Sequence, residues 1–375
     1  MKVLQFYRTY LPETQGGLEE AIRQICIATG RYGAKHRVLT LARVNRVHRI
    51  PRPEAEVIQA PLQLEPAACS MGLALFREYQ KQAKWADIIH IHHPWPFADL
   101  VHLISRVDKP VVLTYHSDIV RQRALEKLYS PLRELFYQKV DKIVSTSLNY
   151  VQTSPVLQKL SPPPEVIPLC LSPDTYKPAS REALKFVDET FGRDFYLFVG
   201  VLRYYKGLHH LVDAAAANGL PVVIAGFDKE EKQLKAQAKK LGATNIKFAG
   251  FVSNDIKQAL FHRCRAVVFP SCQRCEAFGV TLLEGQFHSK PLVTCEIGTG
   301  TSYVNIHGQT GLVIPPDDPN ALSEAMRRLE HDDGLVQQLG AAGRQRFEQL
   351  FSEKQVGDKY MRLYRRLIDG KARIN

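Results

Sequence analysis

The chain of 375 residues is 45% hydrophobic and 23% charged, which excludes a disordered or low-complexity polypeptide and leaves room for two or three domains. Its 50 basic and 38 acidic side chains give a net charge of +12, which favours anionic partners: nucleic acid, an anionic membrane surface or phosphorylated ligands. No apolar run is long enough to span a membrane, and an odd count of seven cysteines argues against a disulfide framework.

Short apolar runs alternate with helical patterns along the whole chain. In the first half the predicted strands cover residues 2–7, 37–41, 57–60, 87–91, 110–115, 141–145 and 165–168, and the helices cover 18–32, 71–83, 99–107, 124–140 and 149–159. In the second half the strands cover 195–199, 221–225, 246–248, 266–270, 291–295 and 311–314, and the helices include 207–217, 229–241, 256–261 and 320–329. Apolar strands that alternate with helices are typical of parallel sheets built from βαβ units.

A proline-rich passage between residues 161 and 178 separates the two halves, because proline interrupts helices and central strands. We therefore predict two doubly wound α/β domains, residues 1–172 and 173–350. A helical segment, 351–375, follows them, and the spacing leaves open whether it packs on the second domain or crosses back to the first. Ligands of such sheets bind beyond the carboxyl ends of the strands, so functional residues are expected in the loops that follow the strands.

The turn after the strand at 195–199 carries two cations. Arg203 and Lys206 stand three residues apart where a helix begins, with Gly200 and Gly207 on either side. Cations beside a helix N-terminus suit a diphosphate, because their charge and the backbone N–H groups point the same way. A basic loop with solvated side chains is the alternative.

Two carboxylates follow the strand at 266–270. Glu276 lies in the loop, and Glu284 lies one to two turns into a helix that begins near Gly279, on an otherwise apolar face. Glutamate is rarely buried without a partner, so packing alone does not explain Glu284. Carboxylates in a cleft can hold the paired hydroxyl groups of a ribose or a hexose. A solvated helix face is the alternative.

These residues resemble the retaining glycosyltransferases of family 4, which have the GT-B fold of two Rossmann-like domains facing across a cleft. Three further segments carry the resemblance, in the expected order: TQGGLE at 14–19, TYHSD at 114–118 and GQTGLVIPP at 308–316. The segment at 297–305 departs from the commonest family pattern. It resembles a subgroup that builds mannose- or rhamnose-containing surface polysaccharide, such as O-antigen, from GDP-sugars.

The resemblance implies a role for each matched residue. Gly16 and Gly17 would let the backbone approach the donor phosphates. Arg203 and Lys206 would neutralise the diphosphate leaving group, and Glu284 would bind the ribose. Glu276 would hold the hexose, and His116 would face the transferred sugar. The start of the following helix would complete the donor site, with Ala277, Phe278, Gly279, Val280 and Thr281.

The implied reaction transfers a mannose- or rhamnose-type hexose from a nucleotide diphosphate sugar, a GDP-sugar, to a lipid-linked saccharide, with retention at the anomeric carbon. The chain contains no Asp-x-Asp, so we expect neither a metal nor a cofactor. No side chain is an obvious covalent nucleophile, which favours a front-face route. Cys272 and Cys275 lack a second pair at zinc-binding spacing, so they are expected to be loop cysteines.

Residues 31–52 contain seven cations and no acidic residue: Arg31, Lys35, Arg37, Arg43, Arg46, Arg49 and Arg52. Such a cluster favours an anionic bilayer, where a lipid-linked acceptor would lie, although a solvated basic face is the alternative. The first residues lack the apolar core of a secretory signal. We therefore expect a cytoplasmic protein that is peripheral on the cytoplasmic face of the inner membrane.

Other functions stay open on the sequence. A nucleotide-sugar 2-epimerase shares the architecture but would need acid and base groups around the sugar carbon, and a UDP-sugar-dependent transferase differs in only a few base contacts. A nucleic-acid partner is not expected, because no aromatic residues interleave with the cations. A dinucleotide-dependent dehydrogenase is disfavoured, because no G-x-G-x-x-G follows the first strand.

Overall fold

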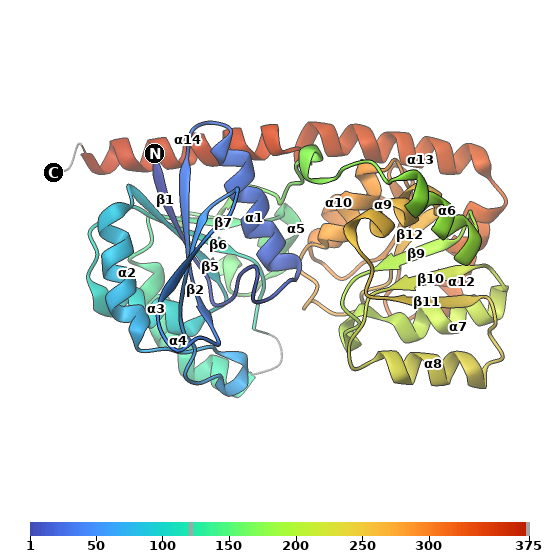
Figure 1. The fold of residues 1–375 in the computed structure, drawn as a ribbon, viewed down its shortest axis with the longest axis horizontal. Helices are drawn as coiled ribbons and strands as arrows, with labels where there is room; N and C mark the ends of the chain where they lie inside the picture. Colours follow the sequence, from blue (N-terminus) through green and yellow to red (C-terminus); the bar gives the residue numbers. More distant parts are fainter. Residues whose placement is uncertain (120–122, 373–375) are drawn as a thin grey trace. The chain divides into compact units, whose positions relative to one another are not determined.

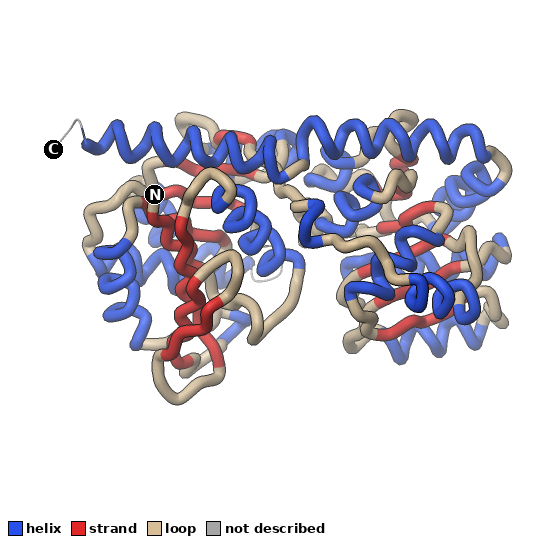
Figure 2. The backbone as a smooth tube through the Cα atoms, turned by 45° about the horizontal axis from the view of Figure 1, so that its top comes forward, coloured by secondary structure: helices blue, strands red, loops and turns tan. Residues whose placement is uncertain are grey.

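The computed structural model describes residues 1–119 and 123–372, and the chain divides into two compact units, each with its own sheet between layers of helices (Figures 1 and 2). The first unit contains Met1–Cys170 together with Glu353–Asn375, and the second is the contiguous segment Leu171–Ser352. None of the helices in the described ranges combines the length and apolar character that a membrane span requires.

The first unit is built on an eight-stranded sheet in the order β3-β4-β2-β1-β5-β6-β7-β8. Its strands are β1 (Lys2–Phe6), β2 (Lys35–Ala42), β3 (His48–Pro51), β4 (Glu56–Pro61), β5 (Ile88–His93), β6 (Val111–Tyr115), β7 (Lys142–Ser145) and β8 (Glu165–Val166). All pairs are parallel except β3, which runs antiparallel to β4 at the edge. Strand β3 was not predicted, because the segment is short, half-exposed and not continuously apolar.

Helices cover both faces of this sheet: α1 (Gly17–Gly30), α2 (Ala74–Trp85), α3 (Pro96–Ser105), α4 (Arg123–Tyr137), α5 (Leu148–Thr153) and α14 (Glu353–Ala372). Tyr79, Val101 and Phe136 of α2, α3 and α4 pack on one face. Ile25 of α1 and Tyr360 of α14 pack on the other, so the C-terminal helix belongs to the first unit. The helix predicted at 149–159 is wrong in its second half, since α5 ends before Pro155.

The second unit is built on a six-stranded, fully parallel sheet in the order β11-β10-β9-β12-β13-β14. Its strands are β9 (Tyr196–Val199), β10 (Val222–Ala225), β11 (Ile246–Gly250), β12 (Ala266–Phe269), β13 (Leu292–Cys295) and β14 (Gly311–Ile314). Its helices are α6 (Arg181–Thr190), α7 (Leu208–Asn218), α8 (Glu231–Lys240), α9 (Asn254–Arg263), α10 (Val280–Phe287), α11 (Gly300–Val304), α12 (Pro319–Glu330) and α13 (Asp333–Arg346). α7 packs against α8 and α12, and α6 packs against α9.

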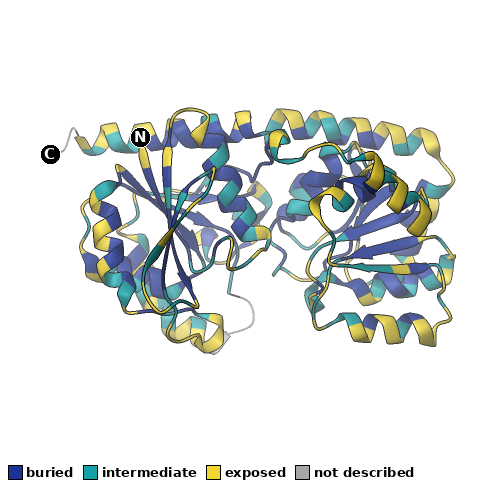
Figure 3. Ribbon diagram, viewed as in Figure 1, coloured by how far each residue is buried: buried dark blue, intermediate teal, exposed yellow. Residues whose placement is uncertain are grey.

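Both sheets confirm the doubly wound prediction. The central strands are buried along most of their length, and the exposed residues lie mainly on the outer faces of the helices (Figure 3). In the second sheet the chain lays down β9, β10 and β11 towards one edge and then returns to place β12 beside β9. In the first sheet β5 returns beside β1 in the same way. Ligands of doubly wound sheets bind where the strand order reverses, which singles out the loops after β9 and β12.

Candidate functional site

The loops after β9 and β12 are held together by their backbones. Gly207, between the turn and α7, has a φ of +65°, and a Cβ there would collide with the carbonyl oxygen of Pro270. Close to this contact, the N–H group of Cys272 donates to the carbonyl oxygen of Tyr205 at 2.9 Å. Glycine is therefore required at position 207 for both its backbone conformation and the close approach of the two loops.

This approach brings Lys206 and Glu276 together. The Lys206 ammonium group donates to Glu276 Oε2, and both side chains are only 11% exposed. The Ser271 hydroxyl group donates to the same oxygen at 3.3 Å, and Lys206 Nζ lies 4.4 Å from the centre of the Phe269 ring. Lys206 is thus a partly buried, paired cation, so the alternative of a solvated basic loop is wrong for this residue.

Arg203 differs from Lys206 in its exposure. Its side chain is 52% exposed, and its Nε donates to Asp228 Oδ2 at 3.0 Å. Asp228 follows β10 and was not among the predicted site residues. Arg203 is therefore a half-exposed cation near the carboxyl ends of β9 and β10. A polyphosphate would have to displace Asp228 to bind it.

Glu284 lies in α10 and is buried, with 4% of its surface exposed. Its Oε1 accepts from Lys257 Nζ of α9 at 2.6 Å. The alternative of a solvated helix face is therefore wrong. The unexpected carboxylate is explained by an ion pair, which leaves its second oxygen as a further acceptor. Sequence spacing gave no signal for Lys257, because the two helices meet only in the folded chain.

The segment between Glu276 and α10 is fixed at several points. Gly279 is the residue before α10 and has a φ of +87°. The Ala277 carbonyl oxygen accepts from Gly300 N–H at 2.7 Å, and the Thr281 hydroxyl group donates to the Val199 carbonyl oxygen at 3.1 Å. Phe278 is buried. The predicted donor residues from Ala277 to Thr281 therefore lie at the ends of β9 and β12, with Lys206 and Glu276.

The remaining predicted site residues lie in the first unit. Gly16 precedes α1 with extended backbone, and a Cβ there would come within 2.8 Å of a carboxylate oxygen of Glu19. Gly17 is the first residue of α1. His116 follows β6, and its N–H group donates to the His93 carbonyl oxygen at 3.0 Å. Burial lowers the pKa of His116 to about 3, so its side chain is neutral.

Of the two loop cysteines, Cys272 lies in a group with metal-ligand chemistry and Cys275 does not, among the described residues. Among the described residues, the one group with metal-ligand chemistry is His210, Cys272 and Asp317, whose ligand atoms lie within 4.8 Å of one another. His210 Nε2 already lies 3.0 Å from Asp317 Oδ1. Burial, with the nearby Asp317, raises the pKa of Cys272 to about 11, so this thiol is protonated.

The basic segment at 31–52 is less charged than its composition indicates. Arg31 pairs with Glu353 at 2.7 Å, and Arg37 and Arg49 both pair with Glu56, at 2.6 and 2.9 Å. Arg52 pairs with Glu54 at 2.7 Å. The segment therefore presents fewer unpaired cations than its composition indicates, because three carboxylates from outside it pair with four of its arginines.

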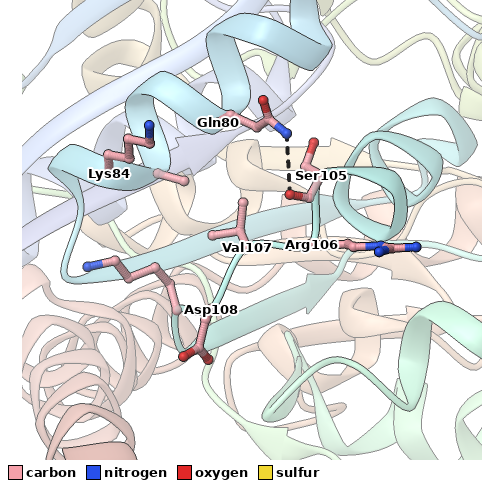
Figure 4. Close-up of a pocket in the computed structure, with 8 residues that line it drawn as sticks. Gln80, Lys84, Ser105, Arg106, Val107 and Asp108 are labelled. Atoms are coloured by element: carbon pink, nitrogen blue, oxygen red, sulfur yellow. Dashed lines mark hydrogen bonds between the residues drawn. The ribbon is translucent and has the colours of Figure 1, made fainter.

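A surface pocket lies elsewhere in the first unit (Figure 4). It is lined by the end of α2 and by the loop before β6, where Gln80 donates to the Ser105 carbonyl oxygen at 3.4 Å. This loop leads into the amino end of β6, whereas the predicted site residues follow the carboxyl ends of strands. The pocket is therefore no candidate for the site.

Comparison with known proteins identifies the family. The model of the family described as "Glycosyltransferase Family 4" matches residues 15–168, and that of "Glycosyl transferases group 1" matches residues 180–346. D-rhamnosyltransferase WbpZ from Pseudomonas aeruginosa is 45% identical over 94% of this chain and 92% of its own. The chain belongs to the glycosyltransferases of group 1 and family 4.

This glycosyltransferase has a second relative of similar length. O-antigen chain mannosyltransferase C from Escherichia coli is 41% identical over 99% of this chain and 100% of its own. Among solved structures, sucrose-phosphate synthase from Thermosynechococcus elongatus superposes with a TM-score of 0.78 over 98% and 99% of the two chains, at 19% identity. That likeness shows the fold alone and confirms the GT-B class expected from the motifs.

Proposed function

We propose that the chain is a retaining hexosyltransferase that moves a mannose- or rhamnose-type sugar from a GDP-sugar to a lipid-linked saccharide in the synthesis of surface polysaccharide. The observation that carries the donor site is the Lys206–Glu276 pair, held by two loops where the strand order of the second sheet reverses. The names of the two relatives, a D-rhamnosyltransferase and an O-antigen mannosyltransferase, support the sugar and the pathway class.

The proposed chemistry separates opposite charges. Breaking the bond between the sugar and the phosphate builds positive charge on the sugar ring and negative charge on the leaving diphosphate. When the donor binds, Lys206 leaves Glu276 and Arg203 leaves Asp228, and both cations pair with the diphosphate. The N-terminus of α10 adds oriented N–H groups. Glu276, released from Lys206, accepts hydrogen bonds from the hexose hydroxyl groups.

The other site residues bind the donor and the acceptor. Glu284 uses its second carboxylate oxygen for the ribose hydroxyl groups, while Lys257 holds the first. Gly16 and Gly17 leave room for the donor phosphates, and His116 accepts a hydrogen bond from a sugar hydroxyl group. No covalent nucleophile is assigned. A phosphate oxygen of the leaving group takes the acceptor proton on the same face, which retains the anomeric configuration.

Divalent metal has no place in this proposal, because the two cations balance the diphosphate charge. The group of His210, Cys272 and Asp317 is explained by a hydrogen bond between His210 and Asp317 and by a protonated thiol. Transfer is therefore expected to proceed in the presence of a chelator.

One experiment tests the proposal. The purified protein is screened by thermal shift against GDP-mannose, GDP-rhamnose, UDP-glucose and ADP-glucose, and the best donor is then incubated with EDTA and a lipid-linked saccharide. Stabilisation by a GDP-sugar and an α-linked product from an α-linked donor are the expected results. Inversion of the anomeric centre contradicts the retaining mechanism, and preference for a UDP-sugar corrects the donor. Conversion of the sugar nucleotide without any acceptor would identify an epimerase instead.

We also propose that the protein works at the cytoplasmic face of the inner membrane, where a lipid-linked acceptor is reached. Within the described residues, no carboxylate pairs with the side chains of Lys35, Arg43 and Arg46, and all three are exposed. A cation near an anionic bilayer contributes about 1 kcal/mol, so losing two lowers binding by roughly thirty-fold.

Vesicle flotation measures this effect. Arg43→Ala/Arg46→Ala is expected to bind vesicles with 30% anionic lipid much more weakly than the unaltered protein, and neither protein is expected to bind neutral vesicles. Lys239→Ala/Lys240→Ala changes the net charge equally on the exposed end of α8 and serves as the control. Equal losses from both pairs would mean that only the net charge of the protein matters.

A further inference from the structure

The centre of the first sheet contains an unusual number of buried histidines: His36 of β2, His90, His92 and His93 of β5, and His116 after β6. The rings of His90 and His92 stack with centres 4.4 Å apart, and those of His92 and His116 stack at 5.2 Å. Burial lowers the pKa of each ring, so all five are neutral. A neutral imidazole has one N–H donor and one bare nitrogen, so each hydrogen bond it makes fixes the role of the other nitrogen.

The direction of these hydrogen bonds is set at helix α1. The Thr29 hydroxyl oxygen lies 2.6 Å from the Ile25 carbonyl oxygen. Because a carbonyl oxygen can only accept, Thr29 donates its single hydroxyl proton to Ile25. The same hydroxyl oxygen lies 2.8 Å from His36 Nε2. It can therefore only accept from His36, which must carry its proton on Nε2 and present a bare Nδ1.

Gln5 links His36 to His92 and fixes the direction of both hydrogen bonds. His36 Nδ1 is an acceptor, so the neighbouring Gln5 Nε2, at 3.5 Å, donates to it. The amide oxygen of Gln5 then faces His92 Nε2 at 2.8 Å and can only accept, which places the proton of His92 on Nε2. His92 Nδ1 is therefore bare.

His116 is the last member. Its Nε2 lies 2.9 Å from His92 Nδ1, so it must donate, and the second nitrogen of His116, Nδ1, carries a lone pair. Within the described residues, His116 Nδ1 has no hydrogen-bond partner. We call the series from Thr29 through His36, Gln5 and His92 to His116 the histidine relay.

A side branch is consistent with this direction. The hydroxyl group of Tyr364 lies 2.7 Å from His90 Nδ1. When Tyr364 donates to His90 Nδ1, the proton of His90 lies on Nε2, which then donates to the Thr114 hydroxyl oxygen at 2.6 Å. The opposite direction would need a second proton on Thr29, because the Ile25 carbonyl oxygen takes the first.

We propose that the histidine relay holds His116 in the tautomer protonated on Nε2, so that bare Nδ1 accepts a hydrogen bond from a hydroxyl group of the bound saccharide. His36, Gln5 and His92 are then positioning residues, and Thr29 selects the tautomer from helix α1. The contact with the saccharide rests on the function proposed above, whereas the tautomer rests on the hydrogen bonds alone. A bare nitrogen favours a hydroxyl group over a phosphate or carbonyl oxygen, neither of which can donate.

Nitrogen NMR of the full chain labelled with ¹⁵N-histidine tests the relay, with the His116 signals assigned from their loss in His116→Asn. The expected spectrum shows His36, His92 and His116 protonated on Nε2, with Nδ1 at the frequency of an unprotonated nitrogen. In Thr29→Val, which has nearly the same shape but no hydroxyl group, both tautomers are expected at His36 and His116. Thr29→Ser restores the hydroxyl group and is expected to restore the single tautomer.

Kinetics connect the tautomer to function. Thr29→Val is expected to lower kcat several-fold with little change in the KM of the donor, and Thr29→Ser to recover kcat. A His116 protonated on Nδ1 in the unaltered protein, or tautomers unchanged in a folded Thr29→Val protein, overturns the relay. Full activity of His116→Asn would instead contradict the proposed contact with the sugar and leave the tautomer result intact, so the two failures are distinguishable.

Discussion

Replacement of Lys206 by alanine is expected to lower kcat/KM for sugar transfer by about 10²–10³-fold, the usual cost of removing one group that stabilises charge in a transition state. The ammonium group is only 11% exposed and lies on Glu276 Oε2, close to the Phe269 ring. Its charge is therefore poorly hydrated and interacts strongly with a diphosphate. The loss is measured by steady-state kinetics with the donor identified by thermal shift.

A substitution of Glu276, the partner of Lys206, distinguishes binding of the diphosphate from transfer of the hexose. Glu276→Gln keeps the shape of the side chain but leaves Lys206 without its anion, so GDP alone is expected to bind more tightly, as measured by calorimetry. Transfer is nevertheless expected to slow, because the amide holds the hexose hydroxyl groups less strongly than a carboxylate. Lys206→Ala is expected to weaken GDP binding.

The control is a pair of the same kind outside the site. Lys235 and Glu231 lie 2.6 Å apart on the exposed face of α8, and Lys235→Ala is expected to change neither GDP binding nor kcat/KM. If Lys206→Ala and Glu276→Gln weaken GDP binding alike, the pair is structural and its assignment to the donor is wrong.

The first unit is expected to lose stability steeply as the pH falls below about 6.5. Burial lowers the pKa of His36, His93 and His116 to about 3, and holds the pKa values of His90 and His92 well below the ordinary value. Below pH 6.5 these histidines become protonated in the unfolded chain but stay neutral in the folded unit, so the free energy of unfolding falls. The stabilisation is complete above that pH and is lost progressively towards pH 3.

The size of the effect is several kcal/mol. Between pH 6.5 and 5.5 each histidine costs about 1 kcal/mol. Asp99 opposes them, because burial raises its pKa and so favours its protonated form in the folded unit as the pH falls. Five histidines outweigh one aspartate, so the net change is a loss of several kcal/mol, comparable with the whole stability of many domains.

Tryptophan fluorescence isolates this unit, because both tryptophans of the chain, Trp85 and Trp95, belong to it. Guanidinium unfolding at pH 7.5, 6.5 and 5.5 is expected to show a smaller fall in the free energy of unfolding between the first two values than between the last two. His90→Gln keeps a hydrogen-bonding side chain but cannot titrate, and it should recover about 1 kcal/mol of that fall. A free energy independent of pH would contradict the neutral state of the buried rings.

The strands and the main site loops were predictable from sequence because their signals are local. Apolar runs mark the buried strands, and Arg203, Lys206 and Glu276 each follow such a run within a few residues. The turn at Gly207 also carries its own signal, since a left-handed residue between a strand and a helix favours glycine.

The hydrogen bonds between distant residues were not predictable, because they depend on the register of the strands. Gln5 pairs with His90 in the β1–β5 ladder, and His92 pairs with Thr114 in the β5–β6 ladder. A shift of one residue would turn these side chains to the opposite face of the sheet. For the same reason, Lys257 could not be predicted as the partner of Glu284. The acidic partners of the basic segment, Glu54, Glu56 and Glu353, lie outside residues 31–52, so the composition of that segment gave no sign of them.

The return of α14 to the first unit has a consequence for how the chain is made. Gly357 of α14 passes so close to α1 that a Cβ would come within 2.6 Å of the Ala28 carbonyl oxygen, and Val356, Tyr360 and Tyr364 fill the core beneath. These residues follow the second unit in the chain and therefore leave the ribosome after it. The amino-terminal half must therefore wait with one face of its sheet covered only in part, by α1, while all the elements of the contiguous second unit are already synthesised. For this protein, the order of completion during translation is expected to run opposite to the order of synthesis.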